Sequence, residues 1–148
     1  MLLVVLVGIA TTVLCLMLQS VFLAYCLRGY VRLRLSRLGR PSKRHSITLL
    51  SLVMMLMLIA NIFQMAIWAG LFMLIGEFDD FEIALYHSAV NFVTLGYGDI
   101  VMSEHRRLLG ALEGANGILM FGVSTATMTA ALMDIFKSIR NSLEKERP

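Results

Sequence analysis

Three long apolar segments constrain the fold of this chain more than any other feature. They cover residues 1–27, 47–75 and 108–136, and the charged residues gather in the stretches between and after them. A helix needs about 20 residues to cross the roughly 30 Å hydrocarbon core of a bilayer. Each segment reaches that length. Only 16% of the chain is charged, whereas an ordinary soluble domain is about one quarter charged. The sequence therefore predicts an all-α membrane protein with three transmembrane helices.

The first segment is predicted to be a retained transmembrane helix over residues 1–27. A secretory signal carries basic residues ahead of an apolar core of about 7–15 residues. Here no basic residue precedes the apolar part, and the segment is longer than such a core. Cys15 and Cys26 lie inside it, and we expect them to behave as small apolar side chains.

The placement of charge predicts how the chain crosses the membrane. Residues 28–46 contain six Arg, one Lys and no acid, and loops of this kind lie in the cytoplasm. The first helix then begins outside, and the basic residues of the short tail, 137–148, place that tail in the cytoplasm as well. We therefore expect a multi-pass protein of the cell membrane with its N-terminus outside and its C-terminus in the cytoplasm.

The basic segment is open to three interpretations. It is a determinant of topology, or a surface for anionic lipid, because each base near the membrane contributes about 1 kcal/mol, or a voltage sensor, whose arginines recur every third residue. Pro41 interrupts that last spacing. No feature of the sequence points to nucleic acid as a partner. The residues expected at the lipid surface are Arg28, Arg32, Arg34, Arg37 and Arg40.

A further apolar segment, residues 81–93, is too short to cross the membrane, because 13 helical residues span only about 20 Å. Asp79 and Asp80 precede it and are favoured at helix starts. A half-length helix followed by an extended return forms a re-entrant hairpin. Its C-terminal end carries the negative pole of the helix dipole into the membrane, which favours a cation there.

The residues that follow, Thr94 to Asp99, form a glycine-punctuated turn at this depth. Irregular backbone inside a membrane survives only where it lines a cavity, because its polar groups otherwise go unpaired. Gly96 and Gly98 alternate with other residues, and glycine's access to positive φ lets successive carbonyls point the same way. This turn resembles the Thr-Val-Gly-Tyr-Gly filter of potassium channel pore domains, with Leu95 in place of the usual Val.

The resemblance covers roughly residues 47–136. It implies an outer helix over 47–76, a pore helix over 81–93, a selectivity filter over 94–98 and an inner helix over 108–136, assembled as a homotetramer. K⁺ is then the permeant ion and no other cofactor is expected. Asp99 would stand at the outer mouth and raise the local cation concentration. The Leu95 and Tyr97 side chains would turn away from the axis and pack against the supporting helix. The ion-binding oxygens would come from the filter residues Thr94, Leu95, Gly96, Tyr97 and Gly98, with the K⁺ sites at the first four.

The inner helix resembles its counterpart in the family at several positions. The resemblance makes Gly117 a gating hinge. Four further residues match the family's water-filled cavity and recur at helical spacing, although spacing alone favours an ordinary packing face over a cavity lining. The residues matching the lining of the water-filled cavity are Ile118, Phe121, Thr125 and Thr129.

The sequence departs from the family around the filter. Val90 stands where well-known relatives have a Glu that supports the aspartate after the filter. We hypothesise that Tyr86 hydrogen-bonds Asp99 instead. In the same rebuilt support, His87 would bond the Tyr97 hydroxyl, and Glu113 of the last helix would support the filter from behind.

Two other classes fit parts of the sequence. Gly-Tyr-Gly-Asp also matches the Gly-x-Gly-Asp motif of intramembrane aspartyl proteases, which need a second aspartate at the depth of Asp99. Asp134 is expected at the opposite membrane face. A nonselective or non-conducting relative, in which the turn is only a structural hairpin, is the other alternative. We predict a passive potassium-selective channel and no enzymatic activity.

Overall fold

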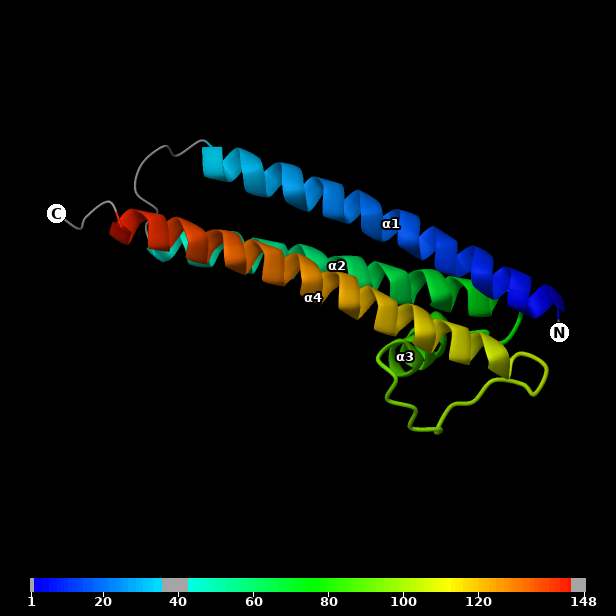
Figure 1. Ribbon diagram of the computed structural model, residues 1–148. Coiled ribbons are helices and arrows are strands. Elements are labelled where there is room, and N and C mark those ends of the chain that lie inside the picture. Colours follow the sequence, from blue (N-terminus) through cyan, green and yellow to red (C-terminus); the bar gives the residue numbers. More distant parts are fainter. Residues whose placement is uncertain (1, 36–42, 145–148) are drawn as a thin grey trace.

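The computed structural model describes residues 2–35 and 43–144, and in these ranges the regular structure is entirely helical. The helices are α1 (Leu2–Leu35), α2 (Lys43–Leu74), α3 (Phe81–Phe92) and α4 (Arg107–Glu144), shown in Figure 1. Three of them are long and apolar enough to cross a membrane, over Leu2–Arg32, Ser46–Leu74 and Arg107–Asn141. The predicted all-α chain with three membrane-length helices is confirmed.

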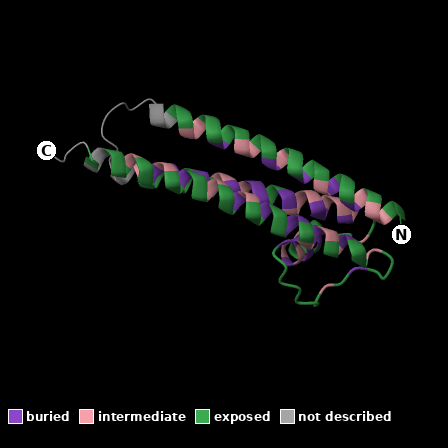
Figure 2. Cartoon of the chain, viewed as in Figure 1, coloured by how far each residue is buried: buried purple, intermediate pink, exposed green. Residues whose placement is uncertain are grey.

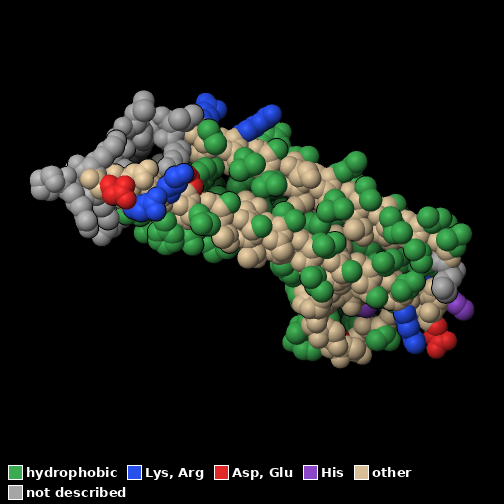
Figure 3. Space-filling view, viewed as in Figure 1, with side chains coloured by type: hydrophobic (Ala, Val, Ile, Leu, Met, Phe, Trp, Pro, Cys, Tyr) green, Lys and Arg blue, Asp and Glu red, His purple; other side chains and the backbone are tan. Residues whose placement is uncertain are grey.

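The three long helices pack against one another along their length. Each of α1, α2 and α4 contacts the other two, and α3 contacts α2 and α4. Figure 1 shows α1 and α4 running in the same direction and α2 running in the opposite one, with α3 at the end where α4 begins. Much of the outward surface is exposed apolar side chain, as Figures 2 and 3 show. Such a surface is stable in lipid and costly in water.

The helices extend beyond the apolar segments that predicted them. α1 continues to Leu35 and α2 begins at Lys43, so the predicted loop over 28–46 is helical at both ends. Likewise α4 continues to Glu144, through most of the predicted tail. The apolar pattern ends at the edge of the hydrocarbon. The helices continue beyond it because Arg, Lys and Leu are good helix formers. Arg37 and Arg40 lie outside the described residues.

Two helix ends also differ slightly from the prediction, and local capping explains both. α2 ends at Leu74 because Gly76 adopts a φ of 71°. The amides of Gly76 and Glu77 donate to the carbonyls of Met73 and Phe72, both at 2.9 Å. This is the Schellman arrangement that terminates many helices. α3 ends at Phe92, one residue early, with Val93 as its C-cap.

The main buried cluster lies where all four helices meet. It combines side chains from α1, α2, α3 and α4 with one from the loop before α4: Cys15, Trp68, Phe72, Phe92, Met102, Leu109 and Met120. A second cluster, toward the other end of the bundle, contains Cys26, Val53, Met57 and Ala131. The first cluster fixes α3, and therefore the loop that follows it, against the membrane helices.

A polar contact inside the membrane joins α1 to α2. The Gln64 side-chain amide donates to the side-chain oxygen of Gln19, Oε1, at 2.8 Å, and both side chains are buried. Hydrogen bonds of this kind between membrane helices contribute on average about 0.6 kcal/mol. The contact fixes the rotation of α1, whose apolar surface runs nearly all the way round.

Candidate functional site

The candidate site is the loop between α3 and α4, residues 93–106, and it is positioned by the two ends of α3. Asp80 is the N-cap, and its carboxylate accepts from the amides of Glu82 at 2.7 Å and Ile83 at 3.2 Å. At the other end the chain turns back on the helix. The amides of Leu95 and Gly96 donate to the Val90 carbonyl, at 2.9 and 3.4 Å. Val90 therefore supports the loop through its backbone.

The backbone of the loop alternates in handedness over residues 94–98. Thr94, Gly96 and Gly98 have φ of 58°, 61° and 74°, whereas Leu95 and Tyr97 do not have positive φ. A Cβ at Gly96 or Gly98 would meet no atom within 4 Å. The glycines are therefore required for their φ and not for space. Thr94 adopts a conformation that is uncommon for a β-branched residue.

One chain leaves this loop largely uncovered. Leu95 is 50% exposed and Tyr97 is 67% exposed, so the expected packing of these side chains against a supporting helix is not found within the chain. A cavity of about 770 Å³ separates the loop from α4, with Asn91, Thr94 and Ile118 among its lining residues. The loop projects from the bundle beside α3 (Figure 1). Its uncovered surface is available to other protein chains.

The predicted hydrogen bond between Tyr86 and Asp99 is present. The Tyr86 hydroxyl donates to Asp99 Oδ2 at 2.7 Å, which joins α3 to the residue that follows Gly98. This bond is the largest cause of the lowered pKa of Asp99 and of the raised pKa of Tyr86. Both shifts follow because the bond favours the charged form of the acid and the neutral form of the phenol.

The predicted bond between His87 and the Tyr97 hydroxyl is wrong, because both ring nitrogens have other partners. Nδ1 lies 3.0 Å from the Ile100 carbonyl, and Nε2 lies 2.9 Å from the Asn91 side-chain nitrogen. Both contacts are satisfied when Nδ1–H donates to Ile100 and Nε2 accepts from Asn91. The ring is buried against Phe72 and Phe78, and this burial lowers the pKa of His87.

Glu113 contacts α3 from behind the loop. Its Oε1 lies 2.5 Å from Ser88 Oγ, and both side chains are fully buried. Ser88 Oγ also lies 2.8 Å from the Met65 carbonyl oxygen. The three residues belong to α4, α3 and α2, so this contact joins the short helix to both membrane helices beside it.

Small residues of α4 allow it to pass close to the end of α3. A Cβ on Gly117 would overlap the Phe92 carbonyl oxygen, and one on Gly114 would lie 3.4 Å from the Asn91 carbonyl oxygen. Gly117 therefore has a packing role. α4 is a continuous helix through this position, and the predicted hinge stays a prediction.

A family model with the description "Ion channel" matches residues 53–134, more than half of the chain. The chain belongs to this ion channel family. Comparison with curated proteins and with solved structures gave no match. The matched region includes most of α2, all of α3, the loop and α4 as far as Asp134, and it leaves α1 outside.

The sequence did not predict one residue that holds the loop of this ion channel, Glu77. Glu77 Oε1 accepts from the Ser103 amide, and Oε2 accepts from the Ser103 hydroxyl at 3.0 Å and from Arg106 Nη1 at 2.9 Å. Burial is the largest influence on the Glu77 carboxyl group and acts to raise its pKa. The bonds from Ser103 and Arg106 together outweigh it, so the pKa of Glu77 is lowered. Ser103 and Arg106 follow Glu77 by 26 and 29 positions and lie in a different loop. No short spacing in the sequence therefore indicates that these side chains meet.

The predicted cavity stripe faces outward from the single chain. Ile118 and Phe121 are exposed at 62% and 39%, and Thr125 and Thr129 are also exposed on the same side of α4.

The two aspartates of the protease interpretation have separate partners. Asp99 accepts from Tyr86, and Asp134 accepts from the Tyr30 hydroxyl at 2.7 Å. α4 alone places about 40 Å between its start and Asp134, so the two aspartates do not form a pair, and the family points to a transporter.

Proposed function

We propose that this ion channel is selective for K⁺ and that four chains surround one pore. The observation that carries the proposal is the alternating handedness of residues 94–98, with positive φ at Thr94, Gly96 and Gly98. Alternation of this kind turns successive carbonyls toward one side, as a ring of ion-binding oxygens requires. The K⁺ sites are formed by the carbonyls of Thr94, Leu95, Gly96 and Tyr97, with Gly98 holding the outer end.

The uncovered surface of the loop supports an oligomer. One loop supplies only one quarter of each oxygen ring, so a single chain cannot replace the hydration shell of an ion. In the proposed tetramer, neighbouring chains cover the exposed Leu95 and Tyr97 side chains and fill the cavity between the loop and α4. The exposed stripe of Ile118, Phe121, Thr125 and Thr129 then lines the inner cavity.

The contacts around the loop suit a rigid filter. Tyr86 holds Asp99, His87 holds the Ile100 carbonyl, and Glu77 holds Ser103. Behind the loop, Glu113 holds Ser88 on the pore helix α3. In well-known relatives a Glu supports the filter at the position where this chain has Val90. We propose that these contacts take over the role of that Glu. A filter whose carbonyls keep a fixed spacing discriminates between ions of different size.

The proposed orientation places the loop outside and the basic ends of α1 and α4 in the cytoplasm. The C-terminal end of α3 then points toward the middle of the membrane, where the helix dipole favours a cation. Asp99, with its lowered pKa, remains charged at the outer mouth.

The test is the reversal potential of purified, reconstituted protein under opposed K⁺ and Na⁺ gradients. A K⁺-selective pore reverses near the K⁺ equilibrium potential. Gly96→Ala abolishes this selectivity, because Ala is strained at a φ of 61°. The matched control is Gly70→Ala in α2, where φ is ordinary and no atom lies within 4 Å of the added Cβ. Current without discrimination in the unaltered protein would establish the nonselective alternative.

A further inference from the structure

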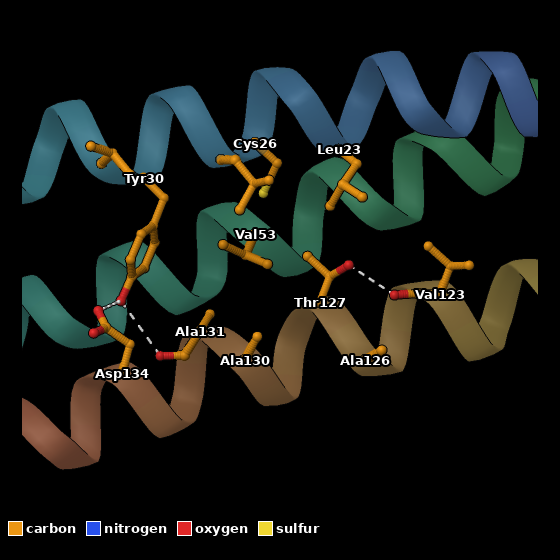
Figure 4. A pocket seen from close by; sticks show the side chains of 12 residues that line it. Leu23, Cys26, Tyr30, Val53, Val123, Ala126, Thr127, Ala130, Ala131 and Asp134 are labelled. Carbon is orange, nitrogen blue, oxygen red and sulfur yellow. Dashed lines mark hydrogen bonds between the residues drawn. The ribbon is translucent and has the colours of Figure 1, made fainter.

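A cavity of about 720 Å³ lies between α1 and α4 in the half of the bundle away from the loop. Figure 4 shows Leu23 and Cys26 on α1 facing Ala126 and Ala130 on α4, with Val53 of α2 behind them. The alanines leave the space that larger side chains of α4 would fill. Because α1 lies outside the region shared with the ion channel family, this cavity is a feature of the added helix.

The cavity is apolar and lies within the membrane-spanning parts of α1 and α4. Its rim includes Leu27 and Val31, which are 53% and 50% exposed. An apolar cavity that opens to a bilayer is filled by hydrocarbon in preference to water, because water there would lack polar partners. Its volume lies within the range of about 300–1,000 Å³ that is usual for ligand pockets.

The cytoplasmic end of the cavity is polar and structured. Tyr30 extends from α1 to α4, where its hydroxyl donates to Asp134 at 2.7 Å (Figure 4). This pair bridges the two helices at the end of the cavity. Next to the rim residues on α1 are Arg28 and Arg32, one helical turn apart and both exposed. Basic side chains project from this part of α1 in Figure 3.

We propose that this cavity binds one acyl chain of an anionic phospholipid, whose phosphate contacts Arg28 and Arg32. Arg28 and Arg32 at the rim favour an anionic headgroup over a zwitterionic one, because a zwitterionic headgroup carries a positive charge of its own. The bound lipid ties α1 to the inner helix α4. The site does not depend on which ion the channel conducts.

The test measures binding of phosphatidylglycerol and phosphatidylcholine to the delipidated, full-length protein by native mass spectrometry. The unaltered protein binds phosphatidylglycerol about thirtyfold more tightly, from the two arginines. Arg28→Gln with Arg32→Gln removes this preference, whereas Arg140→Gln, which removes one exposed positive charge from α4, leaves it intact. Ala130→Leu fills the cavity and removes binding of both lipids, whereas Ala10→Leu on exposed α1 surface does not.

Three results would overturn the proposal. The first is equal binding of the two lipids by the unaltered protein, a measurement that needs no variant. The second is normal lipid binding by Ala130→Leu and by Ala126→Leu, which fills the same cavity from a different position. The third is a change in oligomeric state of these variants with lipid binding unchanged, which would make a neighbouring chain the occupant. Lipid binding is measured without ion gradients, so its failure is separate from a failure of K⁺ selectivity.

Discussion

Ser88 Oγ lies 2.5 Å from Glu113 Oε1, at a point where α3 and α4 meet and neither side chain is exposed. Ser88 Oγ also lies 2.8 Å from the Met65 carbonyl oxygen. A hydroxyl has one proton to donate. Both contacts are therefore satisfied together when the Glu113 carboxyl group is protonated and donates to Ser88, which in turn donates to Met65.

Glu113→Gln is expected to keep this arrangement, because the Gln side-chain amide can donate to Ser88. Glu113→Ala leaves Ser88 without that partner and opens a cavity, at a cost of about 1–3 kcal/mol in the free energy of unfolding. The measurement is thermal unfolding followed by fluorescence of the single tryptophan, Trp68, which is buried. Glu104→Ala, at a side chain 82% exposed, is the control. If Gln were as damaging as Ala, a charged carboxylate would be what α3 requires.

Tyr86→Phe removes only the hydroxyl that donates to Asp99. We expect shorter open times by less than about tenfold, because a solvent-exposed hydrogen bond is weak, while the conductance of the open channel is unchanged. Single-channel recording measures both quantities. Tyr25→Phe, at an exposed position on α1, should match the unaltered protein. Unaltered open times in Tyr86→Phe would mean that the bond does not hold the outer end of the loop.

Gly117→Ala is expected to destabilise the protein by about 1–3 kcal/mol, because overpacking forces the backbone apart. The added methyl group would overlap the Phe92 carbonyl oxygen, whereas Gly122→Ala, on the same helix, meets no atom within 4 Å. Thermal unfolding distinguishes the packing role from the hinge. A Gly117→Ala protein with normal stability and altered gating would favour the hinge alone.

His87 predicts a dependence of stability on pH. Burial is the first cause of its lowered pKa, so the folded protein binds a proton less readily than the unfolded chain does. Above pH 6.5, the ordinary pKa of histidine, the ring is neutral in both the folded and the unfolded protein and costs no stability. As the pH falls below 6.5, the unfolded chain gains a proton more readily than the folded protein does, so stability is lost until the pH has passed the lowered pKa of His87 in the folded protein. A protonated ring can no longer accept from Asn91.

The check is the unfolding temperature measured across this pH range. The decline is expected to shrink in His87→Gln, which cannot titrate, and to persist in His105→Gln, which removes an exposed histidine from the loop. An equal decline in all three proteins would assign the effect to other groups. Glu77 and Asp99 also interact electrostatically with His87, but their own pKa values are lowered, so both stay charged over this range.

Local sequence determined the parts of this protein that obey local rules. Apolar length predicted the three membrane helices, and Asp80 marked the start of α3. Gly96 and Gly98 predicted the positive φ that the loop adopts. The bond from Tyr86 to Asp99 was also predictable, because a short helix followed by a reversed chain leaves few other partners for either side chain.

Only the tertiary structure decided which distant groups meet. It placed His87 beside Asn91 and Ile100 instead of Tyr97, and it joined Glu77 to Arg106 across two loops. The physical reason lies in the solvent. A helix in lipid is apolar on every face, so its sequence does not show which face packs. The cavity between α1 and α4 and the close approach of Gly117 to Phe92 were therefore visible only once the helices had been brought together.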